Sequence, residues 1–372
     1  MNFEINRKNM VEVLNNAVKV VNTKSPLAVL QAIKITAKNN QVTVHATDLA
    51  TSIAQTIEGV VQEPGEIVLP YKAIDLMRKL DNDTIRIEAN SATQHAYVIA
   101  GKTRTFFSCF ASEDFPTFPE PQSIAAEFKI TGAELKEALG KVSYAVGTDA
   151  AREIFTGICF DMEPGKLILA ATDSFRLSIT ETNANPNTEA RPLVPSFIVK
   201  LLPAISGCEE VFMTFSDSLL HIKAGATEIV SVLVKGRYPS YKQLLPSDHQ
   251  LVLKANTKEL KGAMERASLF MTAGSNNAVQ FDLKDGVLEI TAGEGSAKYT
   301  EESAVETLLG QAIGSVFLNG HFTHDAISTI STEATELKFT TQYKPVVITP
   351  HGDNKSVALV VPIRISQAEA AA

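Results

Sequence analysis

The feature that most constrains the fold of this chain is an internal repeat, present three times in its 372 residues. The segment 42–48 reads VTVHATD, and 167–173 reads LILAATD, 125 positions later. The segment 288–294, LEITAGE, takes the same place 121 positions further on. Three prolines at intervals of 123 residues close the copies: Pro116, Pro239 and Pro362. Spacing held over the whole chain indicates three copies of one structural unit.

One helix pattern occurs in each copy. Asn6, Thr131 and Asn256 stand at N-cap positions, where a side-chain oxygen accepts a hydrogen bond from a free backbone N–H. Thr131 with Glu134 also fits a capping box. Apolar residues follow each cap at helical spacing, and equivalent positions are 125 residues apart. The three sets are Met10, Leu14, Ala17 and Val21; Leu135, Leu139, Val142 and Val146; and Leu260, Met264, Ala267 and Met271. We therefore expect the same helix on the same kind of sheet three times.

Each copy is also internally doubled. In the first copy, a strand at 3–5 leads into the capped helix, and strands at 32–37 and 41–46 follow. Then come a strand, a second helix and three more strands: 66–69, 71–80, 85–88, 96–100 and 104–110. The sequence thus predicts an α+β fold of six half-units, each a strand, a helix and further strands.

The second helices of the other copies are expected at 196–205 and 320–330, with Pro203 shortening or kinking the former. Proline-rich segments at 116–121 and 239–246 mark the junctions. The domain boundaries that follow are 1–121, 122–247 and 248–372, the last with a carboxy-terminal tail.

Composition narrows the class of protein. No apolar run approaches the roughly 20 residues that span a bilayer, and the first residues lack the apolar stretch of a signal peptide. Three cysteines, an odd and scattered set, suggest neither a disulfide framework nor a zinc site. We expect a cytoplasmic protein. The net charge of −8 does not exclude DNA binding, because the sign of one face decides it.

The sequence as a whole resembles the beta subunit of bacterial DNA polymerase III, the bacterial sliding clamp family. The most specific segments are 171–177 (ATDSFRL), 236–246 (GRYPSYKQLLP) and 359–365 (LVVPIRI). The resemblance implies three clamp-type domains, each a doubled β-α-β-β-β unit, with outer sheets and inner helices. It implies that one chain forms half of a closed ring and that the head-to-tail homodimer encircles double-stranded DNA without sequence preference. It further implies a processivity factor that tethers the replicative polymerase and other DNA-processing proteins.

Helix packing gives independent support for a dimer. Helices pack about 9–10 Å apart, so the six of one chain would enclose an opening of roughly 8 Å. Two chains would leave roughly 26 Å and three roughly 44 Å, while a duplex is roughly 20 Å wide. Because a closed ring holds DNA by topology, it needs only weak attraction to the phosphates.

Basic side chains on or beside the helices are the candidate DNA contacts, although any single lysine there could simply be solvated. The resemblance favours Lys24 and Arg152, on loops at the rim of the opening. The family often has a basic pair after the proline matched by Pro195; Ser196 and Phe197 stand there instead, with Lys200 as a possible substitute. The main candidates are Lys24, Lys72, Arg78, Lys79, Lys136, Lys141, Arg152 and Lys200. Further candidates are Arg7, Lys8, Lys19, Lys258, Lys261 and Arg266.

The resemblance also implies a hydrophobic groove between the second and third domains that receives short motifs of the polymerase, the clamp loader and other partners. Phe175 stands where the family frequently has histidine, so the preferred motif could differ, and the tail Ser366–Ala372 could shield the groove. Carried over position by position, the wall consists of Phe155, Thr172, Ser174, Phe175, Arg176, Leu177, Pro239, Gln243, Leu244, Leu359, Val360, Val361, Pro362, Ile363 and Arg364. The alternative is that many of these are core residues.

For the dimer interface, the resemblance points to Phe107 meeting Leu269 and Phe270 of the other chain. Phe106, Phe107 and Phe110 form an apolar cluster on an expected edge strand, which invites pairing with another chain. In a monomer the same aromatics would belong to the core.

Two rival classes are an enzyme and a repeat scaffold that binds only proteins. His321, His324 and Asp325 suggest a metal site, but no further ligand set of recognisable spacing accompanies them. The GEGS run at 293–296 lacks the lysine of a phosphate-binding loop. We therefore expect no catalytic constellation, cofactor or metal. A scaffold would have no need of basic residues gathered on one side of its helices.

Overall fold

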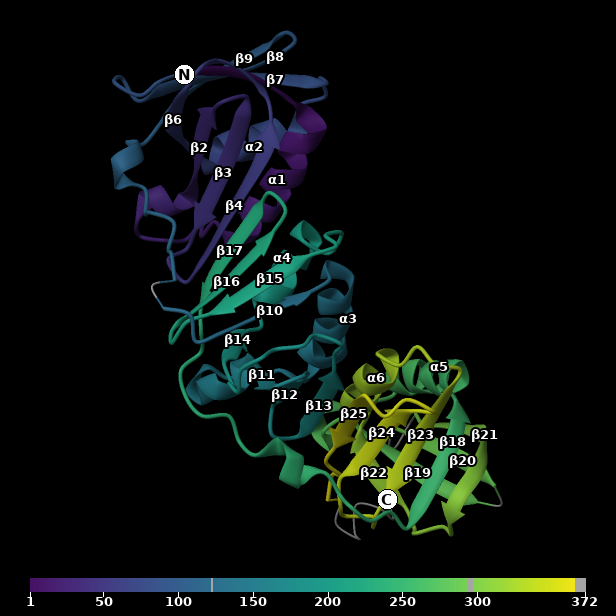
Figure 1. Cartoon of the computed structure of the whole chain (residues 1–372). Helices are drawn as coiled ribbons and strands as arrows, with labels where there is room; N and C mark the ends of the chain where they lie inside the picture. Colours follow the sequence, from purple (N-terminus) through teal and green to yellow (C-terminus); the bar gives the residue numbers. More distant parts are fainter. Residues whose placement is uncertain (122, 285, 294–296, 365–372) are drawn as a thin grey trace. The chain divides into compact units, whose positions relative to one another are not determined.

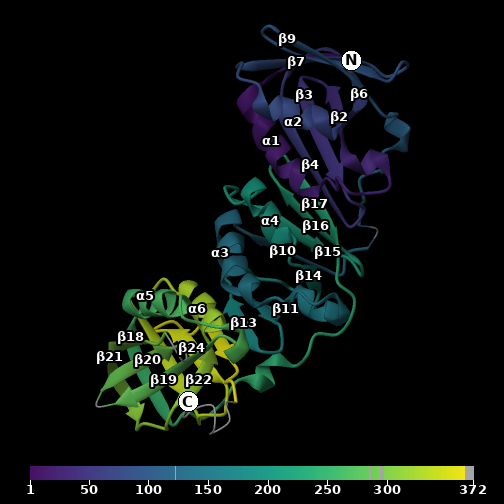
Figure 2. The same ribbon diagram turned by 180° about the vertical axis from the view of Figure 1, so that it is seen from behind.

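The computed structural model describes residues 1–121, 123–284, 286–293 and 297–364. The chain divides into two compact units. The amino-terminal unit comprises 1–136, 184–190 and 197–233, and the carboxy-terminal unit comprises 137–183, 191–196 and the residues from 234 onward. Figures 1 and 2 show the ribbon from two sides.

A β-α-β-β-β order recurs six times in the described residues, as the doubled repeat predicts. The first copy contains β1 (Asn2–Asn6), α1 (Arg7–Val20), β2 (Ala32–Lys38), β3 (Gln41–Thr47), β4 (Thr51–Glu58), an additional β5 (Val60–Glu63), β6 (Gly65–Pro70), α2 (Tyr71–Lys79), β7 (Thr84–Asn90), β8 (His95–Ala100) and β9 (Thr103–Ser108). The second contains β10 (Ala126–Ile130), α3 (Gly132–Val142), β11 (Gly157–Glu163), β12 (Lys166–Thr172), β13 (Arg176–Glu181), β14 (Leu193–Pro195), α4 (Ile198–Leu201), β15 (Val211–Phe215), β16 (Leu219–Ala224) and β17 (Thr227–Val232). The third contains β18 (Leu251–Asn256), α5 (Thr257–Ser268), β19 (Ala278–Lys284), β20 (Val287–Ala292), β21 (Tyr299–Gly310), β22 (Val316–Asn319), α6 (Gly320–Ser328), β23 (Ala334–Phe339), β24 (Val346–Pro350) and β25 (Ser356–Val360).

The three predicted N-caps are confirmed. Asn6 Oδ1 accepts a hydrogen bond from the backbone N–H of Lys8 at 2.9 Å. Thr131 Oγ1 and Asn256 Oδ1 each accept one, at 3.1 Å, from the N–H three residues later. Local side-chain chemistry therefore sets where these helices begin.

All three capped helices end before the last residue of their apolar stripes. Helix α1 ends at Val20, and Val21 is its C-cap residue. Helix α3 ends at Val142 and continues as a 3₁₀ turn, so Val146 lies beyond it. Helix α5 ends at Ser268, and Met271 packs against the core from the following segment. Pro203 acts as expected, because α4 has only four residues and is followed by a 3₁₀ turn at Leu202–Ala204.

In the described part of the chain, antiparallel strands form three sheets. The amino-terminal unit contains a five-stranded sheet, β5-β1-β7-β8-β9, and an eight-stranded sheet, β10-β15-β16-β17-β4-β3-β2-β6. The carboxy-terminal unit contains a twelve-stranded sheet, β14-β11-β12-β13-β25-β24-β23-β18-β21-β20-β19-β22. Two strand pairs join successive copies, β4 with β17 and β13 with β25. We call these the first seam and the second seam, and each includes the turn before its first strand, at 47–51 and at 172–176.

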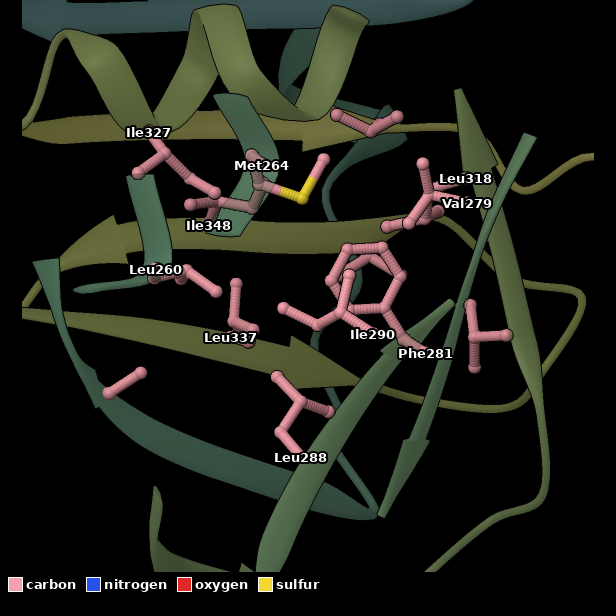
Figure 3. Close-up of a cluster of buried hydrophobic side chains, with 14 of the residues drawn as sticks. Leu260, Met264, Val279, Phe281, Leu288, Ile290, Leu318, Ile327, Leu337 and Ile348 are labelled. Atoms are coloured by element: carbon pink, nitrogen blue, oxygen red, sulfur yellow. The ribbon is translucent and has the colours of Figure 1, made fainter. Parts of the chain in front are cut away.

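The helices cover the apolar faces of the sheets. In the amino-terminal unit, α1 packs on β3 and β4, α2 packs on β6, and α1 contacts both α2 and α4 (Figure 1). In the carboxy-terminal unit, Met264 of α5 and Ile327 of α6 point into the sheet core (Figure 3). Phe281 and Ile290 meet them from the strands (Figure 3). Burial of one stripe leaves the other side of each helix free to carry polar residues.

Strand β4 is an element that the sequence does not predict. Its first residues, Thr51, Ser52 and Ile53, are all buried, so the alternation of polar and apolar residues is missing. Its polar side chains are satisfied inside the protein, for example by the Thr51–Ser231 hydroxyl pair. No helix among the described residues has the length and apolar character needed to cross a membrane.

Candidate DNA-facing helices, partner groove and dimer edge

The helices of the first copy present a basic surface. Helices α1 and α2 together carry six lysine or arginine residues and two acidic ones. Lys72 and Lys79 are exposed on α2, and Lys24 is exposed after α1. Arg78 is half-buried, and its Nε donates to Asn15 Oδ1 at 2.8 Å. Several free cations thus lie on helices that share one face of the sheet.

The candidates in the second copy are more constrained. Lys136 on α3 and Lys200 on α4 are exposed, and the Lys200 ammonium lies 5.2 Å from the centre of the Phe197 ring. Lys141 is paired with Glu137 at 2.8 Å. Arg152 is exposed in the 3₁₀ turn Ala150–Thr156, but it bonds locally to Asp149 at 3.1 Å and to Ser174 Oγ at 3.1 Å.

The helices of the third copy have no excess of positive charge. Helices α5 and α6 carry three basic and three acidic residues, histidines aside. Arg266 forms hydrogen bonds of 2.6 and 2.7 Å with the Glu301 carboxylate, and these raise its pKa. His324 lies 3.7 Å from Glu265. The excess of positive charge on the helices therefore lies mainly in the first copy.

The groove expected from the sequence is organised by the turn at 172–176. Thr172 Oγ1 donates to the Arg176 carbonyl at 2.6 Å, and Asp173 Oδ1 accepts from the N–H groups of Phe175 and Arg176 at 2.9 and 3.0 Å. Ser174 takes a positive φ of 84°. This tight turn leaves the Phe175 side chain 56% exposed.

Strand pairing at the second seam brings further predicted groove residues together. Arg176 pairs with Val360 across β13 and β25, and the Val361 N–H donates to the Phe175 carbonyl at 2.9 Å. Val361 is 37% exposed, and Leu244 is 51% exposed on the 3₁₀ turn Tyr241–Leu244. The seam thus presents apolar side chains beside backbone groups.

The fifteen predicted wall residues divide by burial. Ser174, Phe175, Gln243, Leu244, Val361 and Arg364 are exposed. Phe155, Arg176, Pro239 and Ile363 are half-buried. Thr172, Leu177, Leu359, Val360 and Pro362 are buried. For Leu177, Leu359 and Val360 the core interpretation holds, because they belong to hydrophobic clusters beneath the surface. The tail Ser366–Ala372 lies outside the described residues.

Arg176, one of the predicted wall residues, is held in place by ion pairs. Its side chain is 13% exposed, and it bonds to Asp173 at 2.9 Å and to Asp325 of α6 at 2.7 Å. Its guanidinium also lies over the Phe322 ring, 4.3 Å from the centre. Arg176 therefore ties the turn of the second copy to a helix of the third.

A buried carboxylate that the sequence analysis missed supports the groove wall. Asp161 on β11 is fully buried and accepts from Tyr241 Oη at 2.6 Å, Arg191 Nε at 2.7 Å and Lys242 Nζ at 3.2 Å. Burial alone would raise the pKa of Asp161, but these three donors outweigh it and lower the pKa. The network fixes the segment that carries Leu244. An aspartate within the otherwise apolar run ICFDM was the available signal.

The expected dimer residues lie at sheet edges and helix ends. Strand β9 is an edge of the five-stranded sheet, with Phe106 47% exposed and Phe107 half-buried. Phe110 instead packs against a small core cluster. Leu269, after α5, is 80% exposed, and the Phe270 ring stacks on Tyr299 at 5.5 Å.

The structure also bears on the residues that suggested a metal site or a phosphate-binding loop. Among the residues that the structure describes, no three His, Cys, Asp or Glu side chains are grouped to hold a metal ion. Three residues of the GEGS run, 294–296, lie outside the described ranges. All three cysteines are free.

Comparison with known proteins accounts for this arrangement. Residues 1–119, 129–240 and 242–364 match the N-terminal, central and C-terminal domains of the DNA polymerase III beta subunit, respectively. The beta sliding clamp of Staphylococcus aureus is 26% identical over 379 residues, covering 98% of this chain and 99% of the relative.

Solved structures show the same fold. The sliding clamp of Bacillus subtilis superposes with a TM-score of 0.92 at 25% identity, covering 98% of this chain and 100% of that one. A sliding clamp from Pseudomonas aeruginosa bound to griselimycin gives 0.91 at 24% identity, with the same coverage. Three clamp domains in succession define a subunit of the sliding-clamp class. The chain belongs to the DNA polymerase III beta subunit family.

Proposed function

We propose that this chain is a bacterial DNA sliding clamp, a non-catalytic processivity factor that encircles duplex DNA as a ring-shaped homodimer in the cytoplasm. The match of all three beta-subunit domains along 1–364, on six β-α-β-β-β half-units, carries the proposal. The clamp tethers the replicative polymerase and other DNA-processing proteins, and it requires no cofactor. Its hold on DNA is topological, so the charge of the helices only needs to attract phosphates without sequence preference.

The ring closes where the β9 edge of one chain meets the end of α5 of another. Phe107 packs there against Leu269 and Phe270. Two separate observations support this: Leu269 is 80% exposed, and β9, which carries exposed Phe106, is the last strand of its sheet in the described residues. An edge strand with apolar side chains is a ready site for pairing with a second chain.

Phosphate attraction comes from Lys24, Lys72 and Lys79, assisted by Lys136 and Lys200. Arg78, Lys141 and Arg152 contribute less, because neighbouring carboxylates already pair with them. Each free cation adds to a salt-dependent attraction.

Partner motifs bind at the second seam, against Phe175, Leu244 and Val361. The floor consists of buried Thr172, Leu177, Leu359 and Pro362, and the remaining wall of Phe155, Ser174, Pro239, Gln243, Ile363 and Arg364. Apolar side chains provide affinity, and polar groups at the rim orient the motif. Arg176 shapes the groove through its bond to Asp325 rather than by reaching a motif.

Light scattering tests ring formation. The wild-type chain should have twice its 40.2 kDa mass in solution. Leu269→Asp places a charge in the proposed interface and should shift the protein to monomer. Tyr343→Asp, at another exposed apolar residue of the same unit, is the matched control and should remain dimeric. A monomeric wild type would contradict the proposal.

Partner binding is tested separately with a labelled decapeptide from the clamp-binding segment of the cognate replicative polymerase. Val361→Asp should weaken its binding at least about tenfold, a loss on the order of 1.4 kcal/mol. Tyr343→Asp should leave the affinity unchanged. If wild type, Val361→Asp and Tyr343→Asp bound the peptide equally well, the second seam would not be the binding site.

A further inference from the structure

The first seam repeats the construction of the second seam, residue by residue. Thr47 and Asp48 stand 125 positions before Thr172 and Asp173. Asp48 Oδ1 accepts from the N–H groups of Ala50 and Thr51, at 3.0 and 2.7 Å, as Asp173 does in its own turn. The same side chains therefore build the same turn twice.

The strand that pairs beside the turn is also equivalent. The Val232 N–H donates to the Ala50 carbonyl at 2.8 Å, just as the Val361 N–H donates to Phe175. Thr51 pairs with Ser231 in the register in which Arg176 pairs with Val360. The place that holds Phe175 and Val361 in the proposed partner groove thus exists a second time, within the amino-terminal unit.

Two aliphatic side chains are exposed at the first seam, Leu49 at 56% and Val232 at 38%. Leu27, 54% exposed, stands 125 positions before Arg152, which bonds to Ser174 in the turn of the second copy, and is grouped with them on that equivalence. We call them the first-seam patch. Leu49 has a positive φ of 75°, and the equivalent residue of the second copy, Ser174, has one of 84°. A bulky residue in this conformation is strained. Leu49 bears that strain without being buried, which points to a role at the surface.

A cavity of about 590 Å³ lies over strands β2, β3 and β4 of the sheet that contains the first seam. Its floor includes the paired residues His45 and Ala54, two residue pairs along the sheet from the Thr47–Ser52 pair that begins the turn. Phe115 and Phe118 line it and meet the His45 ring edge-on, at 5.0 and 5.2 Å. His45 is 8% exposed, and its Nε2 has no hydrogen-bond partner among the described residues.

The second copy fills the equivalent space. Tyr238 and Tyr241, which follow Phe115 and Phe118 by 123 positions, pack there in a hydrophobic cluster. Tyr241 reaches Asp161 through its hydroxyl group. The phenylalanines of the first copy have no hydroxyl group to form such a bond, and the strand beneath them carries polar residues. The cavity of the first copy is therefore left unfilled.

We propose that the first-seam patch and this cavity form a second docking site, for a short extended segment of a protein partner. An apolar anchor side chain enters the cavity, and an aliphatic neighbour packs on Leu27, Leu49 and Val232. The positions of Arg152 and Arg176 are occupied here by Leu27 and Thr51, and Lys34 at the rim is neutralised by Glu66 at 2.7 Å. The site therefore selects an uncharged apolar segment, with a polar group that can reach His45.

A selection of displayed random decapeptides on the full-length Val361→Asp chain tests this site while the second seam is impaired. Enriched peptides should be apolar, and their affinity should fall at least about tenfold with Leu49→Gly or Ala54→Leu added. Leu49→Gly removes the side chain and relieves the positive φ, and Ala54→Leu fills the cavity. Adding Tyr343→Asp instead should change nothing.

Absence of enriched peptides, or enriched peptides that still bind the Leu49→Gly and Ala54→Leu chains, would overturn the proposal. A cavity that binds only small molecules would appear as the first of these results. Failure of the partner groove is a separate outcome, because it would appear as polymerase peptide binding that is insensitive to Val361→Asp alone. Thermal unfolding of each variant verifies that the chain still folds.

Discussion

The two seams share one backbone arrangement but are held by different polar chemistry. The first seam uses neutral groups: Thr51 and Ser231 hydroxyls at 3.3 Å, and an amide chain in which Asn16 donates to Gln55 and Gln55 to Thr227, each at 3.1 Å. The second seam also contains a hydroxyl pair, Thr180 with Ser356 at 3.0 Å, but its turn adds charges, because Arg176 lies between two aspartates. In the same copy, outside the seam, Asp161 accepts from three donors. Repetition of the fold therefore preserved strand register and turns, while the polar contacts diverged. The neutral seam should respond little to salt, and the charged seam should respond strongly.

The largest expected difference between the regions is in their response to mild acid. Burial first, and Lys34 second, lower the pKa of His45 to about 4, from 6.5. Below pH 6.5 the imidazole is protonated in the unfolded chain but stays neutral in the folded amino-terminal unit. The contribution of neutral His45 to the unfolding free energy is therefore complete above pH 6.5 and is lost as the pH falls towards 4. The loss should be on the order of 3 kcal/mol.

Urea unfolding of wild type and His45→Gln at pH 7 and pH 4.5 measures this response. The variant should lose less stability than wild type over the same interval. Equal losses would mean that the pKa of His45 in the folded protein is not lowered.

A slightly smaller effect is expected where the second copy is held by charge. Asp161→Ala leaves the buried Tyr241 hydroxyl without its acceptor and should cost about 2–3 kcal/mol. Thr36→Ala, at the equivalent position of the first copy, should cost less than about 0.5 kcal/mol, because Thr36 bonds only to exposed Glu66. Urea unfolding monitored by circular dichroism compares the pair. Equal costs would mean that the Asp161 network adds nothing that the first copy lacks.

The third comparison contrasts the seams directly. Arg176→Met should cost about 1–2 kcal/mol at low salt, since Asp325 is 41% exposed and part of the attraction is screened. Thr51→Val, at the equivalent position, should cost about 1 kcal/mol through the loss of one buried hydroxyl bond. The measurement is the unfolding free energy of each variant at low and at 1 M salt. The cost of Arg176→Met should shrink with salt and that of Thr51→Val should not; the reverse would contradict the assignment of charged and neutral seams.

What could be predicted from the sequence was local. Caps at Asn6, Thr131 and Asn256, the stripes behind them and the helix-breaking effect of Pro203 all depend on residues within a few positions, and they led to the six half-units. The family resemblance then placed Phe175, Leu244 and Val361 at one surface.

What could not be predicted depends on contacts distant in sequence. Arg176 bonds to Asp325, which is 149 residues away in the sequence, and this contact takes up guanidinium donors that a wall residue would otherwise offer to a ligand. Val360 was predicted to line the groove, but its strand is paired on both sides and its side chain is buried in the core. Strand β4 was missed because its buried polar residues find partners across the seam, which hides the usual alternation.

Encirclement of DNA is tested most directly by retention on plasmids of equal sequence and different topology. Clamps placed by the cognate loader and ATP on nicked circles should stay bound through gel filtration at moderate salt. After the circles are cut once, the clamps should slide off the ends and be lost. Equal retention on circular and linear DNA would contradict a ring that holds DNA by topology.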